Sequence, residues 1–206
     1  MFKAKIHAKS SVFDRFAGGL FSGIPLTPNQ WTLLSVVFAS LGFSSLAIFR
    51  NLYVSSVLFF FAFLSDYADG AVARYSKLET RKGAYIDGVS DRFAEAFMIF
   101  GLMFYKIPDV IVDANILLSA LLFFSTMTSY VRAYADHKKI VTNEQELREM
   151  GGLLERFERV SILLVSIAAS LIYGAGIISY CVVMLVLLSA ATVAQRVFYV
   201  LRRSRK

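Results

Sequence analysis

Four aspartates lie close together in a chain that is otherwise sparing with charge. They fall in residues 65–91, which read SDYADGAVARYSKLETRKGAYIDGVSD, at Asp66, Asp69, Asp87 and Asp91. The first pair ends one long apolar segment, and the second pair begins the next. A carboxylate inside or at the edge of a membrane's hydrocarbon layer is costly, and is usually paired, metal-bound or functional. The four aspartates therefore indicate a functional site.

Helical spacing places the members of each pair on one face of a helix, together with small residues. The first face holds Asp66, Asp69, Gly70 and Ala73, with Arg74 at its flank, and the second holds Gly83, Asp87 and Asp91. Small residues let a ligand approach the backbone closely. They are also favoured where membrane helices pack together, and a lone glycine would be explained that way. Small residues beside acids instead favour a hollow, charged site.

Carboxylates gathered in one place repel each other. Two of them about 4 Å apart cost about 4 kcal/mol at an effective dielectric of about 20, so the cluster needs cations or shared protons. One aspartate alone would be explained by reaching into water or by pairing with Arg74 or Arg92, but four converging aspartates would not. Ligation by oxygen alone suits Mg²⁺ or Mn²⁺. We therefore predict a divalent-metal site in this cluster.

The rest of the chain has the composition of an integral membrane protein. Of its 206 residues, 57% are hydrophobic, and the 18% that are charged lie in clusters. Six helices of roughly 20 residues each would account for nearly the whole chain. We predict an all-α membrane protein with one domain over residues 1–206, in which residues 29–206 form a bundle of six transmembrane helices. The uncharged runs behind this prediction are 31–49, 52–65, 97–105, 114–131, 160–174 and 176–195.

Residues 1–28 are expected to form an amphipathic helix in the membrane interface, followed by a linker. Their apolar positions share roughly one helical face, with basic residues among them; these are Phe2, Ile6, Phe13, Phe16 and Leu20. A frayed basic arm is the alternative. The first transmembrane helix is predicted to open near Pro28 with Asn29 as its N-cap. The second is predicted to run from Leu52 to about Tyr75, and the third to begin near Ala84.

The net charge of +7 has a topological explanation rather than a nucleic-acid partner. Of 22 lysines and arginines, all but Arg50 and Lys106 lie in the N-terminal arm, in 74–92, in 132–159 or from Arg196 onward. The positive-inside rule then places both termini and the acidic cluster on the cytoplasmic side of the membrane. The single Cys181 excludes a disulfide framework within the chain, and no signal peptide is evident before residue 31.

The acidic stretch resembles the signature of the CDP-alcohol phosphotransferases. That signature is present with every position and gap as Asp66-x2-Asp69-Gly70-x2-Ala73-Arg74-x8-Gly83-x3-Asp87-x3-Asp91. The resemblance implies an enzyme of phospholipid biosynthesis in a prokaryotic cell membrane. Such an enzyme transfers a phosphatidyl-type group from a CDP-lipid, CDP-diacylglycerol or CDP-archaeol, to a small alcohol and releases CMP.

The resemblance also implies roles for individual residues. Two Mg²⁺ or Mn²⁺ ions would be held by Asp66, Asp69 and Asp87, with Asp91 sharing in this and acting as the general base. The CDP site would be lined by Asp69, Gly70, Ala73, Arg74 and Gly83. The family suggests a homodimer, for which the sequence itself gives no signal.

Two further segments carry candidate residues for an acceptor that bears a phosphate. Ser129 and Arg132 end the predicted fourth helix, and Arg156 and Arg159 begin the fifth. Guanidinium groups match phosphate geometry bidentately, although an arginine can also simply snorkel. The segments resemble the family branch that makes phosphatidylinositol phosphate or archaetidylinositol phosphate from inositol 1-phosphate, departing from it at Tyr134 and Asp136.

Other functions stay open. Glycerol 3-phosphate and serine are the alternative acceptors. A divalent-cation transporter is a different class, but a permeation path needs polar residues through the bilayer midplane, whereas the acids here gather at one side. A catalytically silent scaffold is a third reading. Residues 137–153 would, in an enzyme, be placed to act as a lid over the acceptor.

Overall fold

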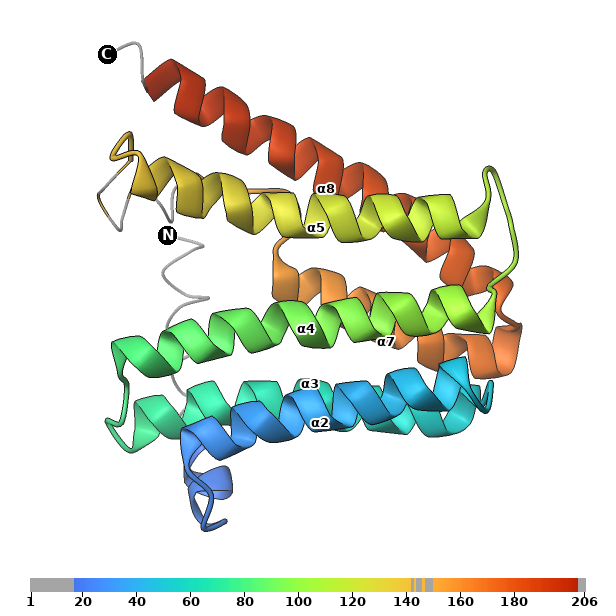
Figure 1. Ribbon diagram of the computed structural model, residues 1–206, viewed down its shortest axis with the longest axis horizontal. Coiled ribbons are helices and arrows are strands. Elements are labelled where there is room, and N and C mark those ends of the chain that lie inside the picture. Colours follow the sequence, from blue (N-terminus) through green and yellow to red (C-terminus); the bar gives the residue numbers. More distant parts are fainter. Residues whose placement is uncertain (1–16, 142, 144–145, 147–149, 204–206) are drawn as a thin grey trace, which may run out of the picture. The chain divides into compact units, whose positions relative to one another are not determined.

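The computed structural model describes residues 17–141, 143, 146 and 150–203, and all regular structure in that part of the chain is helical (Figure 1). The long helices are α2 (Pro28–Ala47), α3 (Leu52–Tyr75), α4 (Arg81–Tyr105), α5 (Ala114–His137), α7 (Arg156–Tyr173) and α8 (Gly176–Arg203). Residues 17–22 are helical as well, while residues 1–16 of the expected interfacial helix lie outside the described residues. The chain divides into two compact units, Met1–Met98 and Ile99–Lys206.

Helix α2 begins two residues earlier than a cap at Asn29 would allow. Its N-cap is Thr27, and Pro28 is the first helical residue, where its missing N–H and fixed φ cost nothing. The backbone N–H of Thr27 donates to Gln30 Oε1 over 2.7 Å, as in a capping box. The prediction of Asn29 as N-cap was therefore wrong, because Thr27 and Gln30, three residues apart, already form the cap of this helix.

Helix α3 follows the predicted course from Leu52 to Tyr75 and packs beside α2 (Figure 1). Asn51 caps it, its side chain accepting a hydrogen bond from the N–H of Val54 over 3.1 Å. The two helices approach closely where a Cβ on Gly42 would lie 2.7 Å from the ring of Phe59, which is completely buried. This packing brings the N-terminal part of α2 alongside the C-terminal part of α3, where Trp31 packs with Ala68 and Val72.

Helix α4 begins at Arg81, three residues before the predicted start at Ala84. Thr80 provides the reason, because its Oγ1 accepts a hydrogen bond from the N–H of Gly83 over 2.9 Å, as an N-cap side chain does. The connection from α3 is consequently short, covering residues 76–80. Asp87 and Asp91 sit about one turn deeper in the helix than the sequence suggested.

The second unit contains α5, α7 and α8, and α8 packs against both of the others. Asp113 caps α5, its Oδ1 accepting from the N–H of Asn115 over 2.8 Å. The helices bury apolar side chains that are 0–1% exposed, including Leu118, Leu121, Leu163, Ile167 and Leu185. Close van der Waals packing of this kind is what holds helices together when lipid surrounds them.

Four helices, α2, α3, α5 and α8, are long and apolar enough to cross a membrane. Among the described helices, α4 and α7 do not meet that description, and both carry several charged residues. Large apolar side chains are widely exposed on the spans, with Leu33, Phe123 and Leu187 at 63%, 58% and 65%. Such surfaces suit a lipid environment, and the chain is an integral membrane protein.

Candidate metal centre and adjoining cavity

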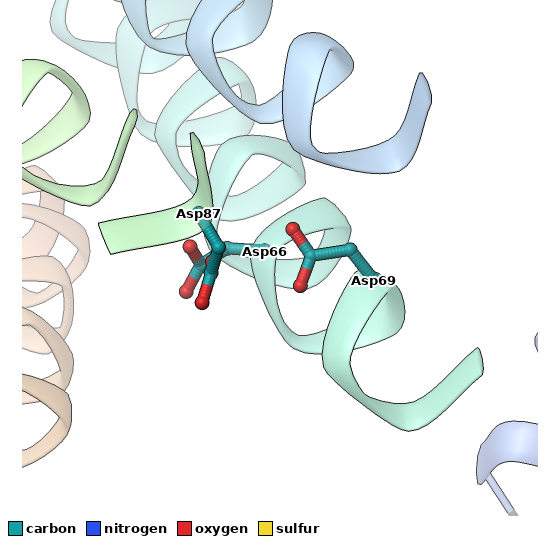
Figure 2. A group of neighbouring side chains, drawn as sticks. All are labelled: Asp66, Asp69 and Asp87. Atoms are coloured by element: carbon teal, nitrogen blue, oxygen red, sulfur yellow. The ribbon is translucent and has the colours of Figure 1, made fainter. Parts of the chain in front are cut away.

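Three of the four aspartates come together in the first unit. One carboxylate oxygen from each of Asp66, Asp69 and Asp87 lies within 4.8 Å of the others. Figure 2 shows the three carboxylates gathered in one place, two from α3 and one from α4. The short 76–80 connection makes this meeting possible, because it returns the chain directly beside the end of α3.

The donor set of this group fits a divalent cation. Hard cations such as Mg²⁺ and Mn²⁺ prefer carboxylate oxygens, and three mutually repelling carboxylates are stabilised by positive charge between them. Asp69 is the most enclosed of the three at 5% exposure. Its Oδ2 accepts a hydrogen bond of 2.6 Å from Thr32 Oγ1 on α2. The cluster therefore has ligands of the right kind and a support from a third helix.

A cavity of about 330 Å³ adjoins the aspartates. All the residues predicted from the sequence for nucleotide binding line it, namely Asp69, Gly70, Ala73, Arg74 and Gly83. Asp87 lines it as well, so the carboxylate group and the cavity share a wall. The predicted hollow beside the acids is thus present, and the small residues Gly70, Ala73 and Gly83 line it.

Further lining residues were not foreseen. These are Pro28, Asn29 and Thr32 from the start of α2, Leu78, Glu79 and Thr80 before α4, and Ala84. Two helices thus present their N-termini to the cavity, and helix N-termini offer unpaired N–H groups and positive dipole charge to an anion. The sequence did contain a signal for the residues from α2. The Thr27-x2-Gln30 capping box starts the helix at Pro28 and so places Asn29 in its first turn.

Two glycines shape the wall of this cavity. A Cβ on Gly70 would lie 3.0 Å from Arg74 Nη1, so the guanidinium of Arg74 lies across the space that a side chain would fill. A Cβ on Gly83 would lie 3.0 Å from Thr80 Oγ1 and 3.6 Å from Asn29 Oδ1. The cavity therefore combines a cation, hydroxyl and amide groups and helix N-termini, which suits a phosphorylated ligand.

The fourth aspartate lies outside the group of three. The Oδ2 atom of Asp91 is 3.9 Å from Arg92 Nη1, and its side chain is 15% exposed. The roles predicted for Asp91 in metal binding and proton transfer stay predictions.

The residues predicted for the acceptor phosphate all belong to the second unit. Ser129 and Arg132 lie on α5, and Arg156 and Arg159 lie in the first turn of α7. Arg159 is 1% exposed. Arg132 and Arg159 are both close enough to Arg196 on α8 to repel it electrostatically. The structure therefore gathers two of the predicted arginines with a third that the sequence reasoning missed.

Arg196 holds several parts of the second unit together. Its Nη1 donates to the carbonyl oxygen of Thr128 on α5 over 2.6 Å, and its Nε to that of Gly151 over 2.8 Å. One turn earlier, Thr192 Oγ1 accepts from the N–H groups of Leu153 and Leu154, each over 3.1 Å. Residues 151–153, the end of the segment considered as a lid, and Leu154 after them are thus fastened to α8.

Comparison with known proteins gives a consistent assignment. Residues 25–198 match the family model described as CDP-alcohol phosphatidyltransferase. The chain is similar to the phosphatidylinositol phosphate synthase of Mycolicibacterium smegmatis, with 31% identity over 150 residues, 70% of this chain and 63% of that protein. It is also similar to the archaetidylinositol phosphate synthase of Methanothermobacter thermautotrophicus, with 28% identity over 195 residues, 93% and 92% of the two chains.

Solved structures agree with the sequence comparison. The phosphatidylinositol phosphate synthase of Mycobacterium tuberculosis with CDP-DAG bound has a TM-score of 0.74 and 26% identity, over 90% of this chain and 94% of that one. The same enzyme in complex with manganese and citrate has a TM-score of 0.73 and 26% identity, over 89% and 88%. The relative therefore accommodates both a CDP-lipid and a divalent cation.

Proposed function

Since the chain belongs to the CDP-alcohol phosphatidyltransferase family, and is therefore a membrane transferase of phospholipid synthesis, we propose that its acceptor is inositol 1-phosphate. In this proposal a phosphatidyl-type group passes from CDP-diacylglycerol or CDP-archaeol to a hydroxyl of the acceptor, and CMP is released. The observation that carries the proposed transfer reaction is the group of Asp66, Asp69 and Asp87 beside a cavity of about 330 Å³.

Asp66, Asp69 and Asp87 are the proposed ligands of two Mg²⁺ or Mn²⁺ ions. Asp91 is proposed to contribute to the same metal site. Bound divalent cations supply charge neutralisation for a diphosphate, which is what phosphoryl transfer mainly requires besides positioning. The chain's own groups do the positioning. Arg74 and the N-termini of α2 and α4 attract the diphosphate, while Gly70, Ala73 and Gly83 leave room for it.

Asp91 is the proposed general base. It takes the proton of the acceptor hydroxyl while that oxygen bonds to the lipid-side phosphorus of the diphosphate. The bond from this phosphorus to the bridging oxygen breaks, and CMP leaves with the electron pair. A carboxylate can do this only from within hydrogen-bond reach of the hydroxyl, so the proposal requires the acceptor to bind beside Asp91.

The arginines of the second unit support an acceptor with a phosphate group. Arg132, Arg156 and Arg159, with Ser129, are the proposed phosphate ligands. Arg132 and Arg159 lie near Arg196, and Glu155 Oε1, 3.7 Å from Arg196 Nη2, supplies one opposite charge. The three arginines support a further anion there, because like charges are stabilised by an opposite one. The named relatives add to this support. Glycerol 3-phosphate remains the first alternative and serine, which offers no phosphate, the second.

The same proposal includes the arrangement in the membrane. Residues 29–206 form a single domain of six transmembrane helices, with both termini and the active site on the cytoplasmic side of a prokaryotic cell membrane, and the enzyme is a homodimer. Lack of charge in the outer parts of the helices and the basic cytoplasmic connections support this orientation.

Release of CMP by the purified full chain tests the proposal. The protein in detergent with Mg²⁺ or Mn²⁺ receives CDP-diacylglycerol or CDP-archaeol and, in parallel, inositol 1-phosphate, glycerol 3-phosphate or serine. We expect release with inositol 1-phosphate and none after chelation of the metal. Turnover with glycerol 3-phosphate or serine, but not with inositol 1-phosphate, would overturn the acceptor.

A further inference from the structure

The hydroxyl of Thr32 makes a short polar contact to an aspartate of the metal centre. Thr32 Oγ1 lies 2.6 Å from Asp69 Oδ2, and the two residues are only 4% and 5% exposed. A hydrogen bond from a hydroxyl to a carboxylate in the 2.5–2.7 Å range is charge-assisted and about twice as strong as a neutral one. The contact therefore has both the length and the enclosure of a strong interaction.

Helix α2 fixes the position of this hydroxyl. Thr32 Oγ1 also lies 3.1 Å from the carbonyl oxygen of Pro28, one turn earlier. A threonine in a helix has few side-chain rotamers, and one of them places the hydroxyl beside that carbonyl. A hydroxyl has one proton to donate, and the carboxylate is the shorter and charged acceptor. The threonine therefore presents a donor of fixed direction to Asp69.

Asp69 gains an orientation from this donor. A carboxylate has two oxygens, each with two lone pairs, and the bond to Thr32 fixes the direction of Oδ2. The carboxylate is thereby held in one orientation toward Asp66 and Asp87, with which it could hold a cation. Groups that hold metal ligands in place from outside commonly control both affinity and activity. Thr32 also lines the cavity, so it contacts both an aspartate of the metal centre and the space proposed for the nucleotide.

We propose that Thr32 is a positioning residue of the metal centre, which sets the orientation of the Asp69 carboxylate through its hydroxyl and thereby the affinity for the divalent cation. The inference rests on the proposed function only in taking the aspartates as metal ligands. It does not depend on the identity of the acceptor.

Binding of Mn²⁺ alone tests the role directly. The full chain in detergent is titrated with Mn²⁺, and the free ion is followed by electron paramagnetic resonance without nucleotide or acceptor. Thr32→Val keeps the shape and removes the hydroxyl, and we expect its dissociation constant to rise by about 10- to 100-fold. Thr32→Ser keeps a hydroxyl and is expected to restore most of the affinity.

Ser35→Ala is the matched control for damage to α2. Ser35 is as buried as Thr32, at 1% exposure, but its hydroxyl donates to the carbonyl oxygen of Thr32 over 2.8 Å. We expect unchanged Mn²⁺ affinity for this variant. In an Asp69→Ala background, Thr32→Val should add no further loss, because a residue that acts through another has no effect without it.

Three results would overturn the inference: wild-type Mn²⁺ affinity in Thr32→Val, an equal loss in Ser35→Ala, or a full additional loss of affinity in the Asp69→Ala background. Absence of Mn²⁺ binding by the wild-type chain would overturn it as well. Failure of every acceptor in the CMP assay, with Mn²⁺ binding still dependent on Thr32, would overturn the proposed function and leave this inference standing.

Discussion

The aspartates of the first unit and the arginines of the second are assembled in different ways. Asp66, Asp69 and Asp87 come from consecutive helices joined by residues 76–80, and a cavity opens beside them. Arg132, Arg159 and Arg196 come from three helices, and Arg196 is engaged by backbone carbonyl groups. The acids thus adjoin a cavity that can hold a ligand, whereas at least one arginine also holds the fold. Substitutions in the first region should lower the rate of the reaction. Substitutions in the second region should weaken acceptor binding or lower the stability of the fold.

The largest expected effect is loss of the acidic cluster. Asp87→Asn removes one of three carboxylates with oxygens within 4.8 Å of one another. We expect kcat/KM for CMP release to fall by at least about 100-fold, because several kcal/mol of charge stabilisation are lost. Asp113→Asn is the control, since asparagine also caps α5. Equal rates for Asp87→Asn and wild type would contradict the metal centre. They would also contradict the difference in role between the aspartates of the first unit and the arginines of the second.

The next effect concerns the second region. Arg159→Gln should raise the KM for the acceptor by about 10-fold, since a hydrogen bond between charged groups contributes about 1.5–3 kcal/mol. The KM for the CDP-lipid should stay unchanged. Initial rates at varied concentrations of each substrate measure both, and thermal unfolding of the variant reports on folding. A change in the KM for the CDP-lipid alone would reverse the roles of the two regions.

A smaller effect is expected at the cavity wall. Gly70→Ala adds a Cβ 3.0 Å from Arg74 Nη1, which displaces the guanidinium slightly. The KM for the CDP-lipid should rise about two- to fivefold, under about 1 kcal/mol. Gly88→Ala on α4 is a matched control, because a Cβ there meets nothing within 4 Å. Similar kinetics for both variants would mean that Arg74 does not contact the nucleotide.

The smallest effect separates stability from chemistry in the second region. Gly151 has a φ of 61°, a left-handed conformation that costs other residues about 1–2 kcal/mol. Gly151→Ala should therefore lower the Tm by about 2–8 °C for a chain of this size. The KM for the CDP-lipid should not change. An unchanged Tm would show that the backbone at this position can relax without cost.

The sequence predicted the acidic site better than the basic one for a physical reason. Asp66, Asp69 and Asp87 lie on helix faces fixed by the 3.6-residue period, and a short connection brings the two faces together. The course of α3 from Leu52 to Tyr75 followed from the same pattern of apolar residues. Local geometry was enough to predict that three of the acids would meet.

The misses concern contacts over long sequence separations and local caps. Asn29 was taken for a cap because the pairing of Thr27 with Gln30 was overlooked, and α4 begins earlier because Thr80 caps it. The contact between Thr32 and Asp69 spans 37 residues, and no periodicity indicates it. Arg196 lay within the basic C-terminal stretch, where charge by itself suggested only topology.

The fastening of residues 151–154 to α8 also bears on the order in which the protein is made. Every residue that lines the cavity has been synthesised once Asp87 has been added to the chain. The arginine cluster, in contrast, has to wait for Thr192 and Arg196, because these residues hold the segment that leads into α7. Chains fold from the N-terminus as they are synthesised, so the cavity beside the aspartates can form during translation well before the arginine cluster is complete.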